Sequence, residues 1–155
     1  MRRNDREVTD AEVIEDFIAG EKIMRVGFYD SGEVYIVPVN YGYSVNNGKY
    51  TFYFHGAPAG RKFELAESSP SAGFEIDGRY SLIPADTACG HSAKFMSVIG
   101  TGRLHIINDN DEKIKALNCL MKQTTGKDKW DYSEQQLKGT AVFRLEAEKL
   151  SCKAK

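Results

Sequence analysis

From residue 23 onward, the chain is a succession of strand-like segments joined by short turns, and this constrains its fold more than any other feature. Segments 23–29 and 34–43 are rich in β-branched and aromatic residues, and Asp30-Ser31-Gly32 separates them. Asn46-Asn47-Gly48 then predicts a tight hairpin turn, because Asn and Gly tolerate positive φ angles. Consecutive strands connected in this way form an antiparallel sheet.

The strand pattern continues along the rest of the chain. Gly78 predicts a turn, and Gly100 and Gly102 indicate a bulge or kink inside a long strand. Because kinked strands let a sheet curve and close, the predicted fold class is mainly β, a β-barrel with flanking helices and roughly six or seven mostly antiparallel strands. The further predicted strands cover 49–55, 72–76, 79–83, 93–107 and 139–150.

Amphipathic periodicity predicts only a few helices. Thr9 is the expected cap of the first helix, with Glu12 reaching back to it, and Gly20 is its expected end. A short helix is expected over 63–68, and a longer one is expected to start at Asn108 or Asp109. The predicted buried faces are Val13, Ile14, Phe17 and Ile18 in the first helix, and Ile114, Leu117, Leu120 and Met121 in the last.

Composition narrows the classes of function. The length of 155 residues predicts one domain, 1–155. The net charge of -1 gives no sign of the positive surface that binds nucleic acid or an anionic membrane. No apolar run is long enough to span a bilayer, and the N-terminal segment 1–6 is too polar for a secretory signal. Three widely spaced cysteines argue against a disulfide framework and favour a cytoplasmic location. Cys89 and His91 lack a second pair with zinc-site spacing, so no metal is expected.

Segment 53–62 carries the strongest functional signal. An aromatic strand ends at His55, small residues follow, and Arg61 and Lys62 open the predicted short helix. A helix start offers unpaired N–H groups and a partial positive charge, so two cations there favour a bound anion such as phosphate. The alternative interpretation is an ordinary strand end and turn, followed by two solvated surface charges.

A second candidate position is Pro38, which lacks an N–H and therefore belongs at an edge or a bulge where the strand ladder breaks. A broken ladder exposes backbone groups that a ligand can pair with, and Asn40 and Tyr41 follow directly. The alternative interpretation is a plain edge strand without a ligand.

Several runs together resemble the 5-nitroimidazole-resistance proteins, which belong to the pyridoxamine 5′-phosphate oxidase-like superfamily with the FMN-binding split-barrel fold. The matching runs are 1–6, 24–28, 35–43, 54–57, 60–62, 97–103 and 111–113. They follow the order of the family and span nearly the whole chain. The superfamily includes oxidases, reductases and haem binders on one fold, so the resemblance predicts the fold more firmly than the reaction.

The resemblance implies a homodimer with two FMN sites between the subunits; FAD and haem are alternative cofactors. Pro38, Val39, Asn40 and Tyr41 would lie along the isoalloxazine ring and offer it backbone contacts. The other implied cofactor contacts are His55, Gly56 and Ala57 near the ribityl chain, Arg61 and Lys62 at the phosphate, Ser97 and Val98 along the cleft, and Trp130 from the partner subunit.

The resulting hypothesis is an FMN-dependent oxidoreductase, similar to a nitroimidazole reductase, that passes electrons from a nicotinamide or other donor to a small aromatic acceptor. The alternative is a flavin- or haem-binding protein without turnover. His55 is the expected catalytic residue, with cofactor contact or haem ligation as its other possible roles. Four aromatic residues are expected to stack the acceptor: Tyr41, Tyr43, Phe54 and Trp130.

Overall fold

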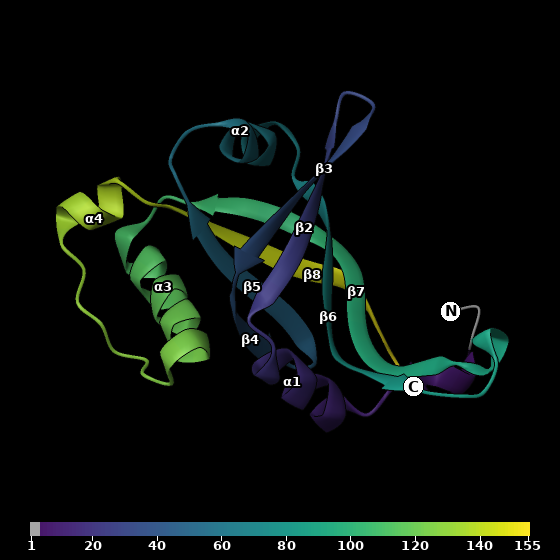
Figure 1. The fold of residues 1–155 in the computed structure, drawn as a ribbon. Helices are drawn as coiled ribbons and strands as arrows, with labels where there is room; N and C mark the ends of the chain where they lie inside the picture. Colours follow the sequence, from purple (N-terminus) through teal and green to yellow (C-terminus); the bar gives the residue numbers. More distant parts are fainter. Residues whose placement is uncertain (1–3) are drawn as a thin grey trace.

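In the computed structural model, which describes residues 4–155, an antiparallel sheet of eight strands forms the body of the molecule (Figure 1). Seven strands follow the order β3-β2-β6-β7-β8-β5-β4, and β1 pairs with β8. The mainly β prediction is therefore confirmed. The strands are β1 (Glu7–Val8), β2 (Ile23–Asp30), β3 (Glu33–Asn40), β4 (Gly42–Asn46), β5 (Lys49–Gly56), β6 (Ser71–Ile83), β7 (Ser92–Ile107) and β8 (Ala141–Ala154).

The two predicted turns between the early strands are confirmed. Asn47 and Gly48 have φ angles of 50° and 74°, as a tight hairpin turn between β4 and β5 requires. The single strand predicted over 34–43 is wrong, because the chain breaks at Tyr41 into β3 and β4. Tyr41 is fully buried and its hydroxyl donates a hydrogen bond of 2.6 Å to the carbonyl of Ile18, which holds the break in place.

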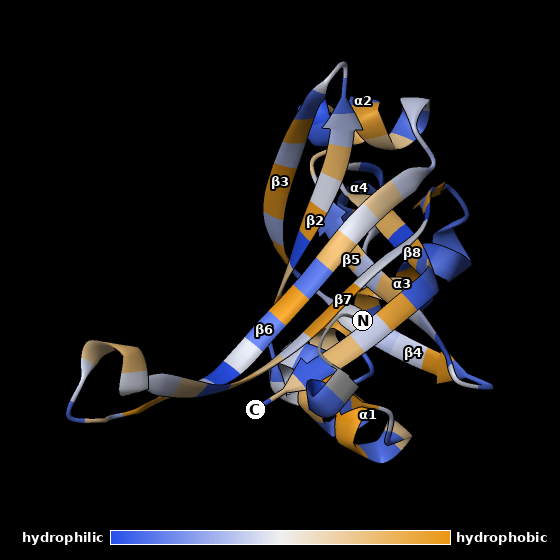
Figure 2. Ribbon diagram, turned by 90° about the vertical axis from the view of Figure 1, so that its right-hand side faces the viewer, coloured by the Kyte–Doolittle hydropathy of each residue, from blue (hydrophilic) through white to orange (hydrophobic). Residues whose placement is uncertain are grey.

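The predicted turn at Gly78 is also wrong, because β6 runs without interruption from Ser71 to Ile83. Gly78 pairs with Met96 of β7, and a bulge follows it before Ser81. A Cβ at Gly78 would lie 2.2 Å from a carboxylate oxygen of Glu21, so this glycine permits a close approach. The bulge predicted near Gly102 is confirmed in the pairing of β7 with β8. Beyond the barrel, β6 and β7 project together as a two-stranded arm (Figure 2).

Helices α1 (Ala11–Gly20) and α2 (Arg61–Ser68) lie at opposite ends of the barrel, and α3 (Asn110–Thr125) lies along its side (Figures 1 and 2). Short turns of helix are η1 (Asn4–Arg6), η2 (Ala88–Gly90) and α4 (Glu134–Lys138). Asp109 caps α3 as predicted. The predicted cap Thr9 is wrong by one residue, because the carboxylate of Asp10 accepts from the N–H groups of Glu12 and Val13. No helix within residues 4–155 is long and apolar enough to cross a membrane.

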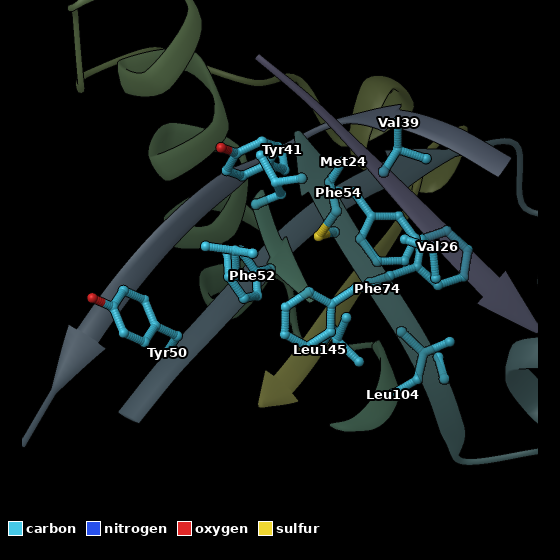
Figure 3. Packing of buried hydrophobic residues seen from close by; sticks show 14 of the residues in the cluster. Met24, Val26, Val39, Tyr41, Tyr50, Phe52, Phe54, Phe74, Leu104 and Leu145 are labelled. Carbon is cyan, nitrogen blue, oxygen red and sulfur yellow. The ribbon is translucent and has the colours of Figure 1, made fainter. Parts of the chain in front are cut away.

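Two buried clusters hold these elements together. The larger fills the barrel and includes Tyr41 and aromatic side chains of β5 and β6 (Figure 3). The smaller joins α3 and α4 to the sheet through Leu117, Leu137 and Val142. The predicted buried helix faces are confirmed for most of their residues. In α1, Val13 is 41% exposed. In α3, Ala116 is buried, whereas Met121 is only half-buried and Ile114 is partly buried. Residues 1–3 of the predicted N-terminal signature lie outside the described residues.

Candidate functional site

The barrel is not closed by hydrogen bonds between β3 and the end of β5. β4 pairs with β5 only as far as Tyr53, whereas β8 pairs with β5 as far as Gly56. β3 pairs with β2 alone, although Cα atoms of β3 and β5 come within 8 Å of each other. The break at Tyr41 therefore leaves two unbridged strand edges, β3 and residues 54–56, which we call the split. Such edges present backbone groups to a ligand.

Lys62 lies at one end of the split. Its ammonium donates a hydrogen bond of 3.1 Å to the carbonyl of His55 and lies 5.4 Å from the ring centre of Phe143. Burial lowers the pKa of Lys62, and no carboxylate lies within 4.0 Å of its ammonium among the described residues. A half-buried cation without an anion is costly unless a ligand supplies the negative charge, so this geometry fits a phosphate.

The start of α2 offers further donors for an anion. Gly60 precedes the helix with a φ angle of 94°, and no side chain caps this end. The N–H groups of Phe63 and Glu64 both donate to the carbonyl of Gly60, so the first turn leaves earlier N–H groups for other acceptors. The helix dipole adds a partial positive charge beside Lys62.

Arg61 departs from the predicted phosphate contact. Its guanidinium pairs with Asp30 at 2.7 Å and with Glu33 at 3.5 Å, and it stacks on the ring of Tyr35. The hydrogen bond to Asp30 is the main reason that the pKa of Arg61 is raised. Arg61 thus anchors the β2–β3 hairpin to α2, and Lys62 remains the cation that is free for a phosphate.

His55 is the last side chain of β5 before the loop of small residues, and it is exposed. Partial desolvation of the ring and then the positive charge of Lys62 lower the pKa of His55. The imidazole is therefore mainly neutral at pH 7, when it can donate or accept a hydrogen bond. Its position beside Lys62 suits either contact with a cofactor or proton transfer to a bound acceptor.

The predicted aromatic wall is wrong for two of its four members. Tyr41 and Phe54 are fully buried in the barrel core, where Phe54 stacks on Phe143 at 4.9 Å (Figure 3). Both side chains therefore belong to the core and have no face open to a ligand. Tyr43 is half-buried, and Trp130 is 37% exposed.

Other predicted residues divide into two groups. Pro38 and Asn40 are exposed at the edge of β3, and Asn40 donates its side-chain amide to the carbonyl of Lys22. Ala57 is exposed directly after β5. The side chains of Val39 and Val98 are buried in the core, so only their backbone groups are available to a ligand.

Ser97 and Trp130 do not join the split within one chain. Ser97 lies on the outer face of β7. In the sheet, β2 and β6 lie between β3 and β7, and β8 lies between β7 and β5. Trp130 lies in the segment after α3, where its indole N–H donates to the carbonyl of Lys127. Neither residue belongs to the two strand edges that form the split.

Two residues of the site were not predicted as members. Phe143 forms the apolar floor under the Lys62 ammonium, and its position in the alternating pattern of β8 was the available signal. Asp30 pairs with Arg61, and no sequence pattern links an acid in a turn to a cation thirty-one residues later.

Comparison with known proteins identifies the family. The structure is a split β-barrel with a half-buried lysine at one end of the split. The profile of the pyridoxamine 5'-phosphate oxidase family matches residues 10–154. The chain belongs to this family. A search of curated proteins returned no match.

Solved structures agree with this assignment. A protein of Bacteroides thetaiotaomicron provisionally assigned to 5-nitroimidazole antibiotic resistance has 27% identity and a TM-score of 0.82, over 96% of this chain and 86% of that one. The flavocytochrome Anf3 of Azotobacter vinelandii has 22% identity and a TM-score of 0.82, over 100% and 72% of the two chains. The FAD and haem binding protein of Mycobacterium smegmatis has 17% identity and a TM-score of 0.82, over 96% and 73%. The last two likenesses concern the fold alone.

Proposed function

We propose that this protein is an FMN-dependent oxidoreductase that resembles nitroimidazole reductases. The observation that carries the proposal is the half-buried Lys62 ammonium at the end of the split, which has no carboxylate within 4.0 Å in the described part of the chain. A bound flavin supplies the electron transfer between a donor and a small aromatic acceptor. The family match and the 27% identical structure support this choice.

In this proposal the chain binds and orients the flavin and its acceptor. Lys62 pairs with the phosphate, and the first N–H groups of α2 add hydrogen bonds to it. The unbridged edge of β3 at Pro38 and Asn40 offers backbone groups to the pyrimidine side of the ring. The backbone carbonyl of His55 accepts a hydrogen bond from Lys62, and the exposed imidazole of His55 holds or donates a proton.

Reoxidation kinetics test the activity. The purified protein is loaded with FMN, reduced without oxygen by NADH or NADPH, and mixed with a 5-nitroimidazole. The proposal expects the bound flavin to be reoxidised faster than free reduced FMN reacts with the same compound. Equal rates would leave the protein as a flavin- or haem-binding protein without turnover, which is the alternative function.

We further propose that two copies of the chain form a homodimer and share each flavin site. The outer face of the sheet exposes apolar side chains: Val34 is 72% exposed, Ile36 59% and Ile99 54%. Pro38, Arg25, Glu75 and Ile99 lie in one row across β3, β2, β6 and β7, so these strands present a continuous face. Exposed apolar side chains of β3 and β7, on either side of the Arg25–Glu75 ion pair, favour association through this face. Dimerisation would also bring Ser97 or Trp130 of a second copy to the split.

Substitution of this face tests the dimer. Ile36→Lys should convert a dimer at micromolar concentration into a monomer, because a lysine in an apolar interface loses its hydration. It should also weaken FMN binding by roughly tenfold or more if the partner completes the site. Sedimentation velocity and FMN titration measure the two effects. Val13→Lys, at an exposed apolar position of α1, serves as the control and should change neither. A wild-type monomer with FMN bound would contradict the dimer.

Gly56 offers a second test of the phosphate site. A Cβ at this position would lie 2.4 Å from the Lys62 ammonium nitrogen and 2.8 Å from its Cε atom. Gly56→Ala should therefore displace the flexible end of Lys62 with little change in stability, and should weaken FMN binding by about tenfold, as expected when a charged hydrogen bond is misplaced. Gly20→Ala is the control, since nothing lies within 4 Å of its Cβ position. Unchanged FMN affinity in Gly56→Ala would show that the position of this ammonium does not matter for the phosphate.

A further inference from the structure

A groove of about 830 Å³ lies at the α1 end of the barrel, away from the proposed flavin site. The start of α1, the β4–β5 hairpin and β8 form its walls. None of the residues predicted to contact the flavin lines it. Because α1 and α2 lie at opposite ends of the barrel (Figures 1 and 2), a ligand here is separate from one at Lys62. The volume falls within the range of small-molecule sites.

Tyr50 is a buried tyrosine in the lining of this groove. The residue is only 8% exposed, and its ring stacks on Phe52 with an angle of 13° and a centroid distance of 6.2 Å. Its hydroxyl points away from the core (Figure 3) and lines the groove, and it has no hydrogen-bond partner among residues 4–155. A phenol held this firmly, with its hydroxyl open to the groove, can form a hydrogen bond with a ligand.

Glu15 supplies a negative charge close to Tyr50. Its carboxylate accepts a hydrogen bond of 3.4 Å from the hydroxyl of Tyr43, whose ring lies 6.4 Å from that of Tyr50. No cation lies within 4.0 Å of this carboxylate among the described residues. Burial and then the negative charge of Glu15 raise the pKa of Tyr50, which agrees with their closeness.

The other charged residues that line the groove either form ion pairs or are exposed. Arg103 pairs with Glu148 at 3.2 Å, and Glu146 pairs with Arg144 at 3.0 Å. Lys49 lies on the hairpin wall and is exposed, as lysines ordinarily are. Lys49 and Glu15 both lack an ion pair among the described residues, but only Glu15 acts on the phenol of Tyr50 through its charge. The lining also includes the apolar residues Ile14, Val45 and Leu150.

We propose that this groove binds an organic ammonium ion with an apolar body. The ammonium donates to the carboxylate of Glu15 and to the phenol oxygen of Tyr50. The apolar body lies on Ile14, Val45 and Leu150. An organic anion would place its charge beside Glu15, which is unfavourable.

Titration of the full-length protein with matched probes tests this site. Phenethylamine is the cation, 3-phenylpropionate the anion and 2-phenylethanol the neutral control, and the NMR signals of labelled tyrosine rings report binding. The proposal expects phenethylamine to bind at least tenfold more tightly than either other probe, because a charged hydrogen bond is lost in both. Tighter binding of 3-phenylpropionate would show that Lys49 dominates and would overturn the proposal. Failure of phenethylamine to saturate would overturn it as well.

Substitutions at Glu15 and Tyr50 test where in the groove the ammonium group binds. Glu15→Gln keeps the shape of the side chain and should weaken phenethylamine by roughly tenfold or more, and Tyr50→Phe should weaken it by several-fold. Glu12→Gln, on the same helix but outside the groove lining, is the matched control and should have no effect. All three variants should bind FMN like wild type, since the two sites are separate. Equal losses in Glu12→Gln and Glu15→Gln would overturn the assignment to Glu15.

Discussion

Lys62→Ala should weaken FMN binding by about 1.5–3 kcal/mol, which corresponds to roughly a tenfold to 150-fold rise in Kd. The reason is that the Lys62 ammonium has no carboxylate within 4.0 Å among the described residues and lies half-buried at the carbonyl of His55. Riboflavin lacks the phosphate, so it should bind wild type weakly and be nearly indifferent to the change. Fluorescence titration of both flavins measures the difference.

Arg61→Ala is the matched control for this substitution. It removes a neighbouring cation of the same helical turn, but this cation already pairs with Asp30. Its effect on FMN affinity should therefore be small, and any loss should appear in the free energy of unfolding. Equal losses of FMN and riboflavin in Lys62→Ala would show that Lys62 acts through the fold instead.

The pH dependence of binding gives an independent check. Burial lowers the pKa of Lys62 below 10.5, so its positive charge is lost earlier than that of an ordinary lysine as the pH rises. Wild-type affinity for FMN should fall as the pH rises toward 10.5, in the range where Lys62 loses its proton. The affinity of Lys62→Ala should not show this fall.

His55→Ala should slow the reoxidation of bound reduced flavin by a 5-nitroimidazole about a hundredfold, which is typical of a lost general acid. Its effect on FMN affinity should be much smaller. Stopped-flow kinetics per bound flavin separate the two effects. If the variant loses flavin but keeps its rate per bound flavin, His55 is only a cofactor contact.

The sign of the pH effect follows from the lowered pKa of His55. The imidazolium, which is the better proton donor, becomes the main form only at a pH below the ordinary histidine pKa of 6.5. The wild-type rate should therefore rise as the pH is lowered through this range and then level off. His55→Ala should lack that rise, whereas a flat wild-type profile would argue against proton donation by His55.

Local sequence patterns predicted the elements of the fold well where a short-range rule applies. Asn47 and Gly48 have the positive φ angles that their turn requires, and the bulge occurs at Gly102. The failures at Tyr41 and Gly78 have long-range causes. Tyr41 breaks a strand because its ring is buried and its hydroxyl reaches the carbonyl of Ile18. The sequence predicted a turn at Gly78, but this glycine lies within β6, where the carboxylate of Glu21 occupies the space that a Cβ would need.

The candidate site shows the same division. The place of Lys62 at the start of α2 was predictable because the strand, the loop of small residues and the helix start all lie within one segment. The different role of Arg61 was not, since Asp30 becomes its partner only after the β2–β3 hairpin folds against α2. Aromatic composition predicted Tyr41 and Phe54 as a ligand-facing wall, but their inward register places them in the core.

The most direct test of the central claim is a visible-absorption titration of the purified protein, stripped of any bound chromophore, with FMN and separately with haem. The account predicts saturable binding of one FMN per chain, with the flavin double band in the blue region shifted from that of free FMN and the shift reduced in Lys62→Ala. Saturation by haem with a sharp Soret peak and no uptake of FMN would contradict it.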